Sequence, residues 1–351
     1  MSILAILPII ILSAIVSALF IRLLTPVANA AGLVDTPDAR KHHVGAVPLV
    51  GGVAIFLTLA IGFSLVALFV PEQLLGADFL LPVAAGGALM VITGIFDDQY
   101  NLGVARRTLL TFAAALIFAV GYGLPPVELG DLFGTGHLWV ASGFMTCVFA
   151  AICIFGIVNA FNMLDGHDGV LGLQLCVGIL TFHIVVRAPL RLEEAMVLGA
   201  VIGFLVSNLG LLSAVPRSFM GDSGSMFLGF IVAAFLLAAP LKNQFTLQPV
   251  TALYLVGLPL VDMVSVAVRR LAQRRSPFAA GSDHIHHLFT AAGFSSRQTL
   301  LCVTLLGSIY PAIGGYFHLQ GTSVSVQFWI IFGLGFVHLY ATSRLFHRIA
   351  V

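Results

Sequence analysis

Residues 79–98 read FLLPVAAGGALMVITGIFDD, an apolar stretch that ends in two adjacent aspartates. Its first 18 residues carry no charge, which is close to the length of helix that crosses the apolar layer of a membrane. Asp97 and Asp98 mark the end of that layer, because a carboxylate inside it is costly. This one stretch therefore predicts a transmembrane helix with a polar site at its end.

The composition of the whole chain indicates the same class. Of its 351 residues, 59% are hydrophobic and only 9% are charged, and the mean hydropathy is +1.07. A soluble domain typically carries about 25% charged residues, so the bilayer is the solvent that suits this chain. The net charge of +1 provides no basic field for nucleic acid, and no nucleic-acid partner is expected. The N-terminus runs directly into an apolar segment, so we expect the first span to be retained.

Segments of spanning length predict an all-α, polytopic membrane protein with about 11 transmembrane helices in a single domain. The predicted spans lie near residues 3–24, 48–70, 79–96, 108–124, 138–158, 170–187, 196–213, 226–241, 250–268, 299–317 and 325–343 of the 1–351 chain. The loops expected to carry the chemistry lie near 25–47, 97–107, 159–169, 214–225 and 269–298.

Basic residues indicate the side on which these loops lie, since cytoplasmic loops carry an excess of Lys and Arg. With this number of spans, thirteen of the 16 basic residues fall on the side of the five loops. That side is expected to be cytoplasmic, which places the N-terminus outside and the C-terminus inside. The same side collects nine of the eleven Asp, whereas all four Glu fall on the other. This clustering predicts a site for a hard cation and phosphate.

The first of these loops runs from Asp35 to His43 and precedes a predicted helix start at Gly51. Its cations, Lys41 among them, could hold a phosphate beside the free N–H groups of that helix start. They could equally touch anionic lipid head groups. The residues alone do not choose between these two interpretations.

The second loop begins with Asp97 and Asp98 and continues to Arg106 and Arg107. Two adjacent carboxylates repel each other, and desolvation at a membrane boundary adds to that cost. A divalent cation or a cationic partner would relieve the repulsion, and Mg²⁺ commonly takes one or two carboxylates together with phosphate oxygens. The alternative is a solvated helix end without a ligand.

The third loop reads NAFNMLDGHDG from Asn159 to Gly169. Carboxylates, amides and glycines at this density are poor material for a membrane helix, and the glycines permit tight turns between Asp165 and Asp168. A functional role is therefore favoured over a purely structural one. His167 is ambiguous by itself.

The fourth loop ends in GDSGS, residues 221–225, and opens into a predicted span. An Asp between glycines at a helix N-terminus suits a metal ligand with a phosphate close by. The common alternative for Asp222 is an N-cap that serves the helix alone.

The fifth loop carries Arg269 and Arg270, and later Asp283 followed by the histidine-rich segment HIHH, residues 284–287. Paired arginines suit diphosphate oxygens, because the guanidinium group donates two parallel hydrogen bonds. The histidines could bind Zn²⁺, but no Cys accompanies them, so hydrogen bonds to an anion or a sugar are favoured. Asp262 lies seven residues before Arg269 on the same helical face, which predicts an ion pair. His183 and His338 fall within spans and are expected to be packing residues rather than ligands.

Taken in order, the motifs resemble one family. They read DxPxxRKxH from Asp35, then Asp97-Asp98, NAFNMxDGxDG from Asn159, GDxGS from Gly221 and HIHH from His284. This order is similar to that of the polyprenyl-phosphate N-acetylhexosamine-1-phosphate transferases of glycosyltransferase family 4, most of all to the bacterial undecaprenyl-phosphate N-acetylglucosaminyl branch. The resemblance is collinear from Asp35 to Phe294. His167 departs from it, because the family motif has an apolar residue there.

The resemblance implies transfer of an N-acetylhexosamine 1-phosphate from a UDP-sugar to undecaprenyl phosphate in the bacterial inner membrane. UMP would be released on the cytoplasmic side, with Mg²⁺ or Mn²⁺ as the cofactor, and the product would start a cell-surface polysaccharide such as O antigen. In the peptidoglycan branch of the family the histidine run is contiguous, whereas Ile285 interrupts it here, which favours a plain N-acetylhexosamine donor. A second copy of the chain is a further candidate partner.

The resemblance also implies roles for individual residues. Asp97 and Asp98 would lie at the catalytic centre, and the candidate metal ligands are Asp222, Asp98 and Asp165. The residues expected to face the nucleotide are Asn162, Asp165 and Asp168. Those expected to bind sugar or phosphate are Lys41, His43, Arg269, Arg270, His284, His286 and His287.

A phosphate monoester is mostly dianionic at neutral pH, since its second pKa is about 6. It can attack without a strong base, so single displacement is favoured, although the sequence leaves Asp97 or Asp98 open as a base or as the nucleophile of a two-step route. The main rival function is a transporter of an anionic solute, which would hold its binding groups near the bilayer midplane. Here nearly every ionisable residue falls in a loop or at the end of a span. A lipid-binding scaffold would leave the aspartates unexplained.

Overall fold

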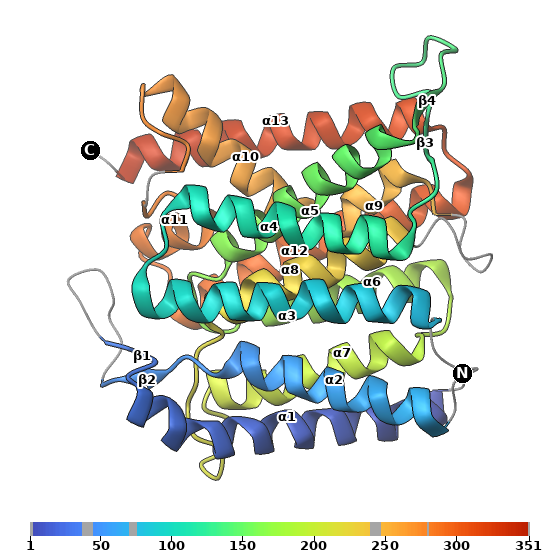
Figure 1. The fold of residues 1–351 in the computed structure, drawn as a ribbon. Helices are drawn as coiled ribbons and strands as arrows, with labels where there is room; N and C mark the ends of the chain where they lie inside the picture. Colours follow the sequence, from blue (N-terminus) through green and yellow to red (C-terminus); the bar gives the residue numbers. More distant parts are fainter. Residues whose placement is uncertain (1–2, 37–44, 70–75, 239–246, 279–280, 350–351) are drawn as a thin grey trace. The chain divides into compact units, whose positions relative to one another are not determined.

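The computed structural model describes residues 3–36, 45–69, 76–238, 247–278 and 281–349. Within these ranges the chain forms thirteen α-helices and two antiparallel two-stranded hairpins (Figure 1). It divides into two compact units, each made of stretches that are distant in sequence. The first unit comprises Met1–Tyr122 and Pro189–Ile231, and the second comprises Gly123–Ala188 and Val232–Val351.

The first unit is built on closely packed helices. Its elements are α1 (Ile3–Ala31), β1 (Val34–Asp35), β2 (Val47–Pro48), α2 (Gly51–Phe69), α3 (Ala77–Tyr100), α4 (Val104–Tyr122), α7 (Leu192–Asn208) and the beginning of α8 (Gly221–Ala238). Helices α1 and α7 lie side by side (Figure 1), and Gly199 and Gly203 on α7 face the backbone carbonyls of Ile10 and Ala14 on α1. A Cβ at either glycine would clash with α1, so small residues one turn apart permit this contact.

The second unit contains the remaining elements. They are β3 (Val127–Gly130), β4 (Trp139–Ala141), α5 (Phe144–Leu164), α6 (Val170–Val186), the rest of α8, α9 (Pro249–Leu255), α10 (Gly257–Ala272), α11 (Ile285–Ala291), α12 (Ser296–Gln320) and α13 (Val324–Ile349). Helix α6 packs against α12, and α10 packs against both α5 and α13. The direction of the chain changes by 83° between α9 and α10.

Gln327 on α13 holds the helix next to this bend. Its side-chain oxygen accepts a hydrogen bond from Thr251 Oγ1 at 2.6 Å, and its amide nitrogen donates to Gln248 Oε1 at 2.7 Å. The hydroxyl of Tyr254 donates to the backbone carbonyl of Gln327 at 2.5 Å. These three hydrogen bonds fix the side chains of α9 and of the residue before it against α13, next to the bend.

The predicted class of a helical, multi-pass membrane protein is confirmed. Every predicted span overlaps a helix, and within the described ranges eight helices are long and apolar enough to cross a membrane. The bent pair α9–α10 raises that number to nine. The other two overlapping helices, α6 and α7, have 17 residues each, a length of about 25 Å. The count of eleven spans and the orientation of the termini remain predictions.

The helices extend further into the polar motifs than hydropathy indicates. Helix α3 runs to Tyr100, so Asp97 and Asp98 occupy its last turn instead of a loop. Helix α5 runs to Leu164 and includes Asn162, and α8 begins at Gly221 and includes the GDSGS motif. Hydropathy reports where the chain is apolar, whereas the backbone stays helical as far as its hydrogen bonds are made.

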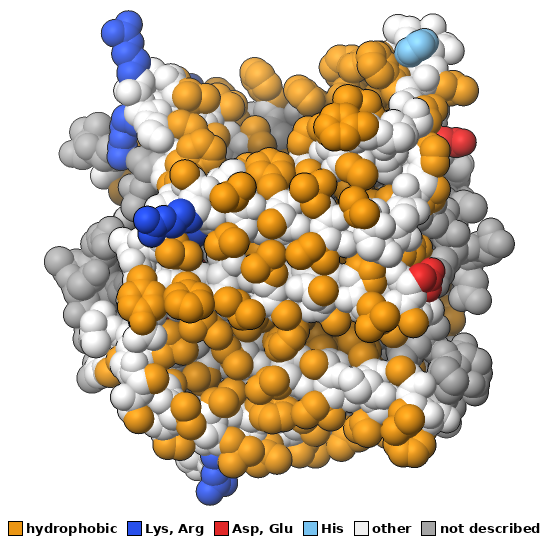
Figure 2. Space-filling view, in the orientation of Figure 1, with side chains coloured by type: hydrophobic (Ala, Val, Ile, Leu, Met, Phe, Trp, Pro, Cys, Tyr) orange, Lys and Arg blue, Asp and Glu red, His pale blue; other side chains and the backbone are white. Residues whose placement is uncertain are grey.

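The surface agrees with a membrane environment. On the face drawn in Figure 2, hydrophobic side chains spread over the helices and the charged side chains lie toward helix ends. On α3 and α4, for example, Leu81, Leu109 and Val120 are 69%, 69% and 68% exposed. Apolar side chains this exposed on successive helices suit contact with lipid.

Candidate active site

The beginning of α8 is held in place by the beginning of α2 in the first unit. The backbone N–H groups of Gly51 and Gly52 donate to the carbonyls of Phe219 and Met220 at 3.0 and 2.9 Å. The N–H of Phe219 donates in turn to the carbonyl of Pro48 at 3.0 Å. The phosphate role considered for this helix start is therefore not available to these two N–H groups, because both already donate to protein.

Glycines let three helices meet at this point. A Cβ at Gly52 on α2 would clash with the backbone of Gly224, and a Cβ at Gly94 on α3 would clash with the backbone nitrogen of Ser223. Gly221 itself has φ of +70°, a left-handed conformation that favours glycine. The motif GDSGS is thus placed by backbone contact against α2 and α3.

Three carboxylates meet as a result, which we call the carboxylate cluster: Asp97, Asp98 and Asp222. The backbone N–H of Asp222 donates to Asp98 Oδ1 at 3.0 Å, a favourable position for a carboxylate at a helix N-terminus. Arg107 on α4 places Nη1 at 2.8 Å from Asp97 Oδ2 and at 4.0 Å from Asp222 Oδ2. Asp222 is the second residue of α8, so the N-cap alternative does not describe it.

Asp97 also carries an unsatisfied buried atom. The residue is 6% exposed, and its Oδ1 has no hydrogen-bond partner among the residues that the structure describes. A buried oxygen without a partner is costly and calls for a bound group. No set of three or more His, Cys, Asp or Glu side chains in the described ranges is arranged to hold a metal ion by itself. A cation here would need oxygens from its substrate as well, which is how Mg²⁺ is commonly bound.

The DGHDG segment, residues 165–169, lies in the second unit between α5 and α6. Asp165 is the C-cap residue of α5, and its N–H donates to the carbonyl of Phe161 at 3.1 Å. Asn162 lies on the last turn of the same helix. Gly169 has φ of +76° and precedes α6. Asn162, Asp165 and Asp168 therefore lie at one end of the α5–α6 pair, and their role toward a nucleotide remains a prediction.

His167 has a local structural partner on each side of its ring. Its Nδ1 lies 3.2 Å from the carbonyl oxygen of Asp168, and its Nε2 lies 3.2 Å from Ser296 Oγ at the start of α12. The histidine that departs from the family motif thus links this segment to the start of α12.

The histidine-rich segment forms the start of α11 and lies against the DGHDG segment. His286 is 1% exposed, and its Nε2 faces Gly166 so closely that a Cβ there would clash with it. Neither ring nitrogen of His286 has a hydrogen-bond partner in the part of the chain that the structure describes. The rings of His284 and His286 are stacked with centroids 6.1 Å apart, and those of His286 and His287 are 4.2 Å apart.

The environment of His286 and His287 favours neutral rings. Burial lowers the pKa of His286 well below its ordinary value, and the neighbouring His287 lowers it further. Burial also lowers the pKa of His287, with a smaller contribution from the charge on His284. A neutral imidazole offers one hydrogen-bond donor and one acceptor, which suits a sugar hydroxyl or amide better than it suits an anion.

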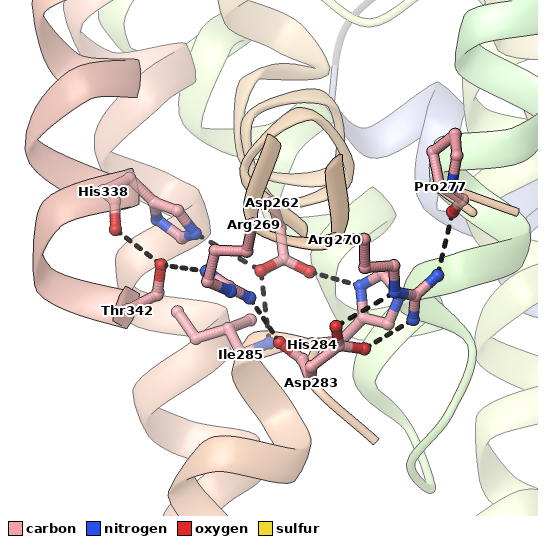
Figure 3. Close-up of polar contacts among 9 residues, drawn as sticks. All are labelled: Asp262, Arg269, Arg270, Pro277, Asp283, His284, Ile285, His338 and Thr342. Atoms are coloured by element: carbon pink, nitrogen blue, oxygen red, sulfur yellow. Dashed lines mark hydrogen bonds and ion pairs between the residues drawn. The ribbon is translucent and has the colours of Figure 1, made fainter. Parts of the chain in front are cut away.

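Arg269 and Arg270 are turned toward protein acceptors (Figure 3). Arg270 is 2% exposed and binds both carboxylate oxygens of Asp283, at 3.0 and 2.5 Å, and the carbonyl of Pro277 at 2.9 Å. Arg269 donates to Thr342 Oγ1 and to the carbonyl of Asp283, each at 2.6 Å. These groups brace the histidine-rich segment, and a direct diphosphate contact would require them to exchange these hydrogen bonds.

Burial raises the pKa of the Asp283 carboxyl, but the hydrogen bonds and charge of Arg270 outweigh it, and the net pKa is lowered. Asp283 is thus ionised at neutral pH and matches the buried arginine. In the same loop Arg274 and Arg275 are exposed. These two exposed arginines can still bind an anion, which is the role that the sequence suggested for arginines in this loop.

The predicted ion pair between Asp262 and Arg269 is replaced by a different arrangement. Asp262 accepts hydrogen bonds from His284 Nδ1 at 2.8 Å and from the backbone N–H of Ile285 at 3.2 Å, and it lies 3.3 Å from His338 Nε2. His338 is a partnered packing residue as expected, and so is His183, whose Nδ1 lies 3.2 Å from the carbonyl of Ala188. Asp262 and Arg107 are the residues to which the sequence gave no role in the site. The signal for both was an ionisable residue close to the end of a span.

Lys41 and His43 lie outside the described residues, and their proposed roles remain predictions. The roles proposed for the other residues named from the sequence also remain predictions. The structure brings the carboxylate cluster together in the first unit. In the second unit it brings the DGHDG segment against the histidine-rich segment.

This is the architecture of a multi-pass membrane protein with ionisable groups concentrated at helix ends, and comparison with known proteins gives its family. The model of glycosyl transferase family 4 matches residues 80–239. Undecaprenyl-phosphate alpha-N-acetylglucosaminyl 1-phosphate transferase of Escherichia coli O157:H7 is 34% identical over 303 residues, which is 85% of this chain and 80% of the relative. The protein of the same name from Haemophilus influenzae Rd is 31% identical over 329 residues, 91% of this chain and 89% of the relative.

The chain therefore belongs to the polyprenyl-phosphate N-acetylhexosamine-1-phosphate transferases of glycosyl transferase family 4. The resemblance drawn from the five motifs is confirmed.

Proposed function

We propose that this protein transfers N-acetylglucosamine 1-phosphate from UDP-N-acetylglucosamine to undecaprenyl phosphate and releases UMP. The observation that carries the proposal is the carboxylate cluster with Arg107, in a chain 34% identical over 85% of its length to a transferase named for this reaction. A site with three carboxylates and one guanidinium is net negative, so anionic substrates require a cation to enter it.

In the proposed reaction, an oxygen of the lipid phosphate forms a bond to the β-phosphorus of the UDP-sugar. The bond from that phosphorus to the bridging oxygen breaks, and UMP leaves with the electron pair. The lipid phosphate is largely dianionic at neutral pH, so no strong base is needed and one displacement suffices. Isolation of a covalent aspartyl-phosphate on Asp97 or Asp98 would overturn the single-step route.

The residues of the cluster fit a divalent cation. Asp98 and Asp222 would hold Mg²⁺ or Mn²⁺, and the buried Oδ1 of Asp97 is the further oxygen without a partner among the described residues. When bound, the cation would neutralise the charge of the phosphate oxygens in the transition state. Arg107 holds Asp97 in place and adds a positive charge beside it. Asp165 stays the third candidate ligand from the sequence.

The sugar is the substrate part that the histidine-rich segment suits best. His286 and His287 have lowered pKa values, so each presents a neutral ring with one donor and one acceptor. Asn162, Asp165 and Asp168 on the adjoining DGHDG segment would contact the nucleotide.

The proposed location is the bacterial inner membrane with the site facing the cytoplasm, and the lipid-linked product would start a surface polysaccharide such as O antigen or enterobacterial common antigen. We also propose a homodimer, which a measurement of the molar mass of the protein in detergent would test.

The decisive assay measures UMP. Purified protein in detergent is incubated with UDP-N-acetylglucosamine, undecaprenyl phosphate and Mg²⁺, and UMP release is expected only when all three are present. Chelation with EDTA should reduce the rate to background, because the phosphates then meet the carboxylates without a cation, and added Mg²⁺ or Mn²⁺ should restore it. Background rates with this donor and with other UDP-N-acetylhexosamines would refute the proposed function. A rate of UMP release that EDTA does not change would refute the proposed cation cofactor and leave the proposed reaction standing.

Gly94→Ala tests whether backbone contact positions Asp222. The new Cβ would clash with the Ser223 nitrogen, so α8 must move away from α3 and carry Asp222 from Asp98. A displacement of about 1 Å at a reacting site can lower the rate by roughly 10²-fold, and UMP release is expected to fall by that order. Gly333→Ala is the matched control, because a Cβ at Gly333 meets nothing within 4 Å. Equal rates in the two variants would show that this contact does not position the cluster.

A further inference from the structure

The last helix of the chain supplies two buried polar residues to the histidine-rich segment (Figure 3). His338 and Thr342 lie one turn apart on α13, and Thr342 Oγ1 donates to the carbonyl of His338 at 2.8 Å. Thr342 is 5% exposed, and the side chain of His338 is 9% exposed. Neither residue belongs to the motifs that define the site. Polar groups buried in an apolar helix need a reason, since each costs free energy unless it is partnered.

His338 contacts the carboxylate that orients His284. Asp262 is 1% exposed, and its Oδ2 lies 2.8 Å from His284 Nδ1. Its Oδ1 accepts from the backbone N–H of Ile285 at 3.2 Å and lies 3.3 Å from His338 Nε2. Both oxygens of the Asp262 carboxylate therefore contact the start of α11, and Oδ1 also contacts His338 on α13.

The contact between Asp262 and His284 fixes which ring nitrogen of His284 is presented to a ligand. With Nδ1 directed at a carboxylate, the ring proton is placed on Nδ1 and the ring plane is set, so Nε2 is the atom left for substrate. The same arrangement, a carboxylate behind a histidine, keeps tautomer and orientation constant in other enzymes.

Thr342 also holds the beginning of the histidine-rich segment, through Arg269 and the backbone of Asp283. It accepts from Arg269 Nη1 at 2.6 Å, and Arg269 Nη2 donates to the backbone carbonyl of Asp283 at 2.6 Å. Residues 283–285 are therefore connected to α13 by two separate routes, one through Arg269 and one through Asp262. Both routes lie wholly within the second unit.

We propose that His338 and Thr342 are positioning residues that fix His284 for hydrogen bonding to the sugar part of the donor. They act through Asp262 and Arg269 and do not touch the substrate. The inference rests on the proposed function and deepens it, because it makes the C-terminal helix a determinant of donor affinity.

Two pairs of variants test the proposal. His338→Leu and Thr342→Val remove the hydrogen bonds, whereas His338→Gln and Thr342→Ser retain a donor or a hydroxyl. We expect KM for UDP-N-acetylglucosamine to rise about tenfold in the first pair, with kcat within about threefold of the wild type, because ground-state binding of the donor is lost. Gln and Ser should bring KM back to within about threefold of the wild type. The Kd for the same UDP-sugar, measured by calorimetry, should follow KM.

The lipid-facing Phe336 on the same helix, 73% exposed, provides the control Phe336→Leu, which should leave KM and kcat unchanged. Thr342→Val keeps nearly the same shape, so it carries the test even where His338→Leu does not accumulate. A lowered melting temperature with unchanged KM and Kd in the first pair would overturn the positioning role and leave a structural one. So would a raised KM that Gln and Ser fail to correct. A wild-type protein that neither releases UMP nor binds the UDP-sugar would instead refute the proposed function, and the inference with it.

Discussion

Asp98→Asn and Asp222→Asn are each expected to lower UMP release by at least about 10³-fold. The amide has the size of the carboxylate, so the hydrogen bond from the Asp222 backbone to position 98 can still form. What is lost is a negative charge at the point where cation and phosphates would meet, and removal of one preorganised electrostatic group commonly costs about 10²–10³ in rate. A lost ligand to the cation adds to that cost.

The control for these variants is Asp131→Asn. Asp131 accepts hydrogen bonds from the backbone N–H groups of Gly134, Thr135 and Gly136 in the β3–β4 hairpin, and it belongs to no proposed site. All three variants should enter the membrane and elute from size exclusion like the wild type, and only Asp131→Asn should retain its rate. Wild-type turnover by Asp98→Asn or Asp222→Asn would exclude that residue from the active site.

Arg270→Met is expected to lower the stability of the protein by roughly 3–5 kcal/mol. The change leaves the carboxylate of Asp283, which is 8% exposed, buried without the guanidinium that binds both of its oxygens. An unpaired buried charge carries a penalty of this size. The midpoint of thermal unfolding in detergent should fall by roughly 5–10 °C.

The double variant Arg270→Met/Asp283→Leu separates the unpaired charge from lost packing. It should recover most of the stability, because it leaves no charge to desolvate, whereas Arg275→Met at an exposed position should change stability by no more than about 0.5 kcal/mol. The lowered pKa of Asp283 gives the pH dependence. The stabilisation is full above the unfolded value of about 3.9 and is lost as the pH falls below it. A double variant no more stable than Arg270→Met would show that the ion pair is not the cause.

The positions of the helices could be predicted because the membrane imposes a length. An uncharged stretch such as 79–96 has few structures open to it in lipid, and α3 indeed covers it. The helix ends were harder to predict, because polar residues continue a helix as readily as they end it. Asp97 and Asn162 fell within predicted loops and Asp222 at the boundary between a loop and a helix, and all three lie in helical turns. The bend at Val256 and the short helix α11 depend on tertiary partners and have no hydropathy signal.

The site was predictable in its residue types and less so in their partners. The resemblance implied Asp97 and Asp98 at the catalytic centre and Asp222, Asp98 and Asp165 as metal ligands. The structure places Asp97, Asp98 and Asp222 together with Arg107. The sequence also assigned Arg269 and Arg270 to phosphate, whereas both are buried against protein acceptors. A guanidinium group suits a carboxylate as well as a diphosphate, so residue type cannot tell which one it will meet.

By itself, then, the sequence determined the membrane class, the family and the identity of the acidic and histidine-rich segments, because apolar length and ordered motifs are local properties of the chain. Only the tertiary structure decided that glycines on α2 and α3 admit the start of α8, and that Asp262 faces His284 and His338 instead of Arg269. These are choices among partners distant in sequence. They follow from which helices pack together and how closely, and a buried charge accepts the donors that packing brings to it.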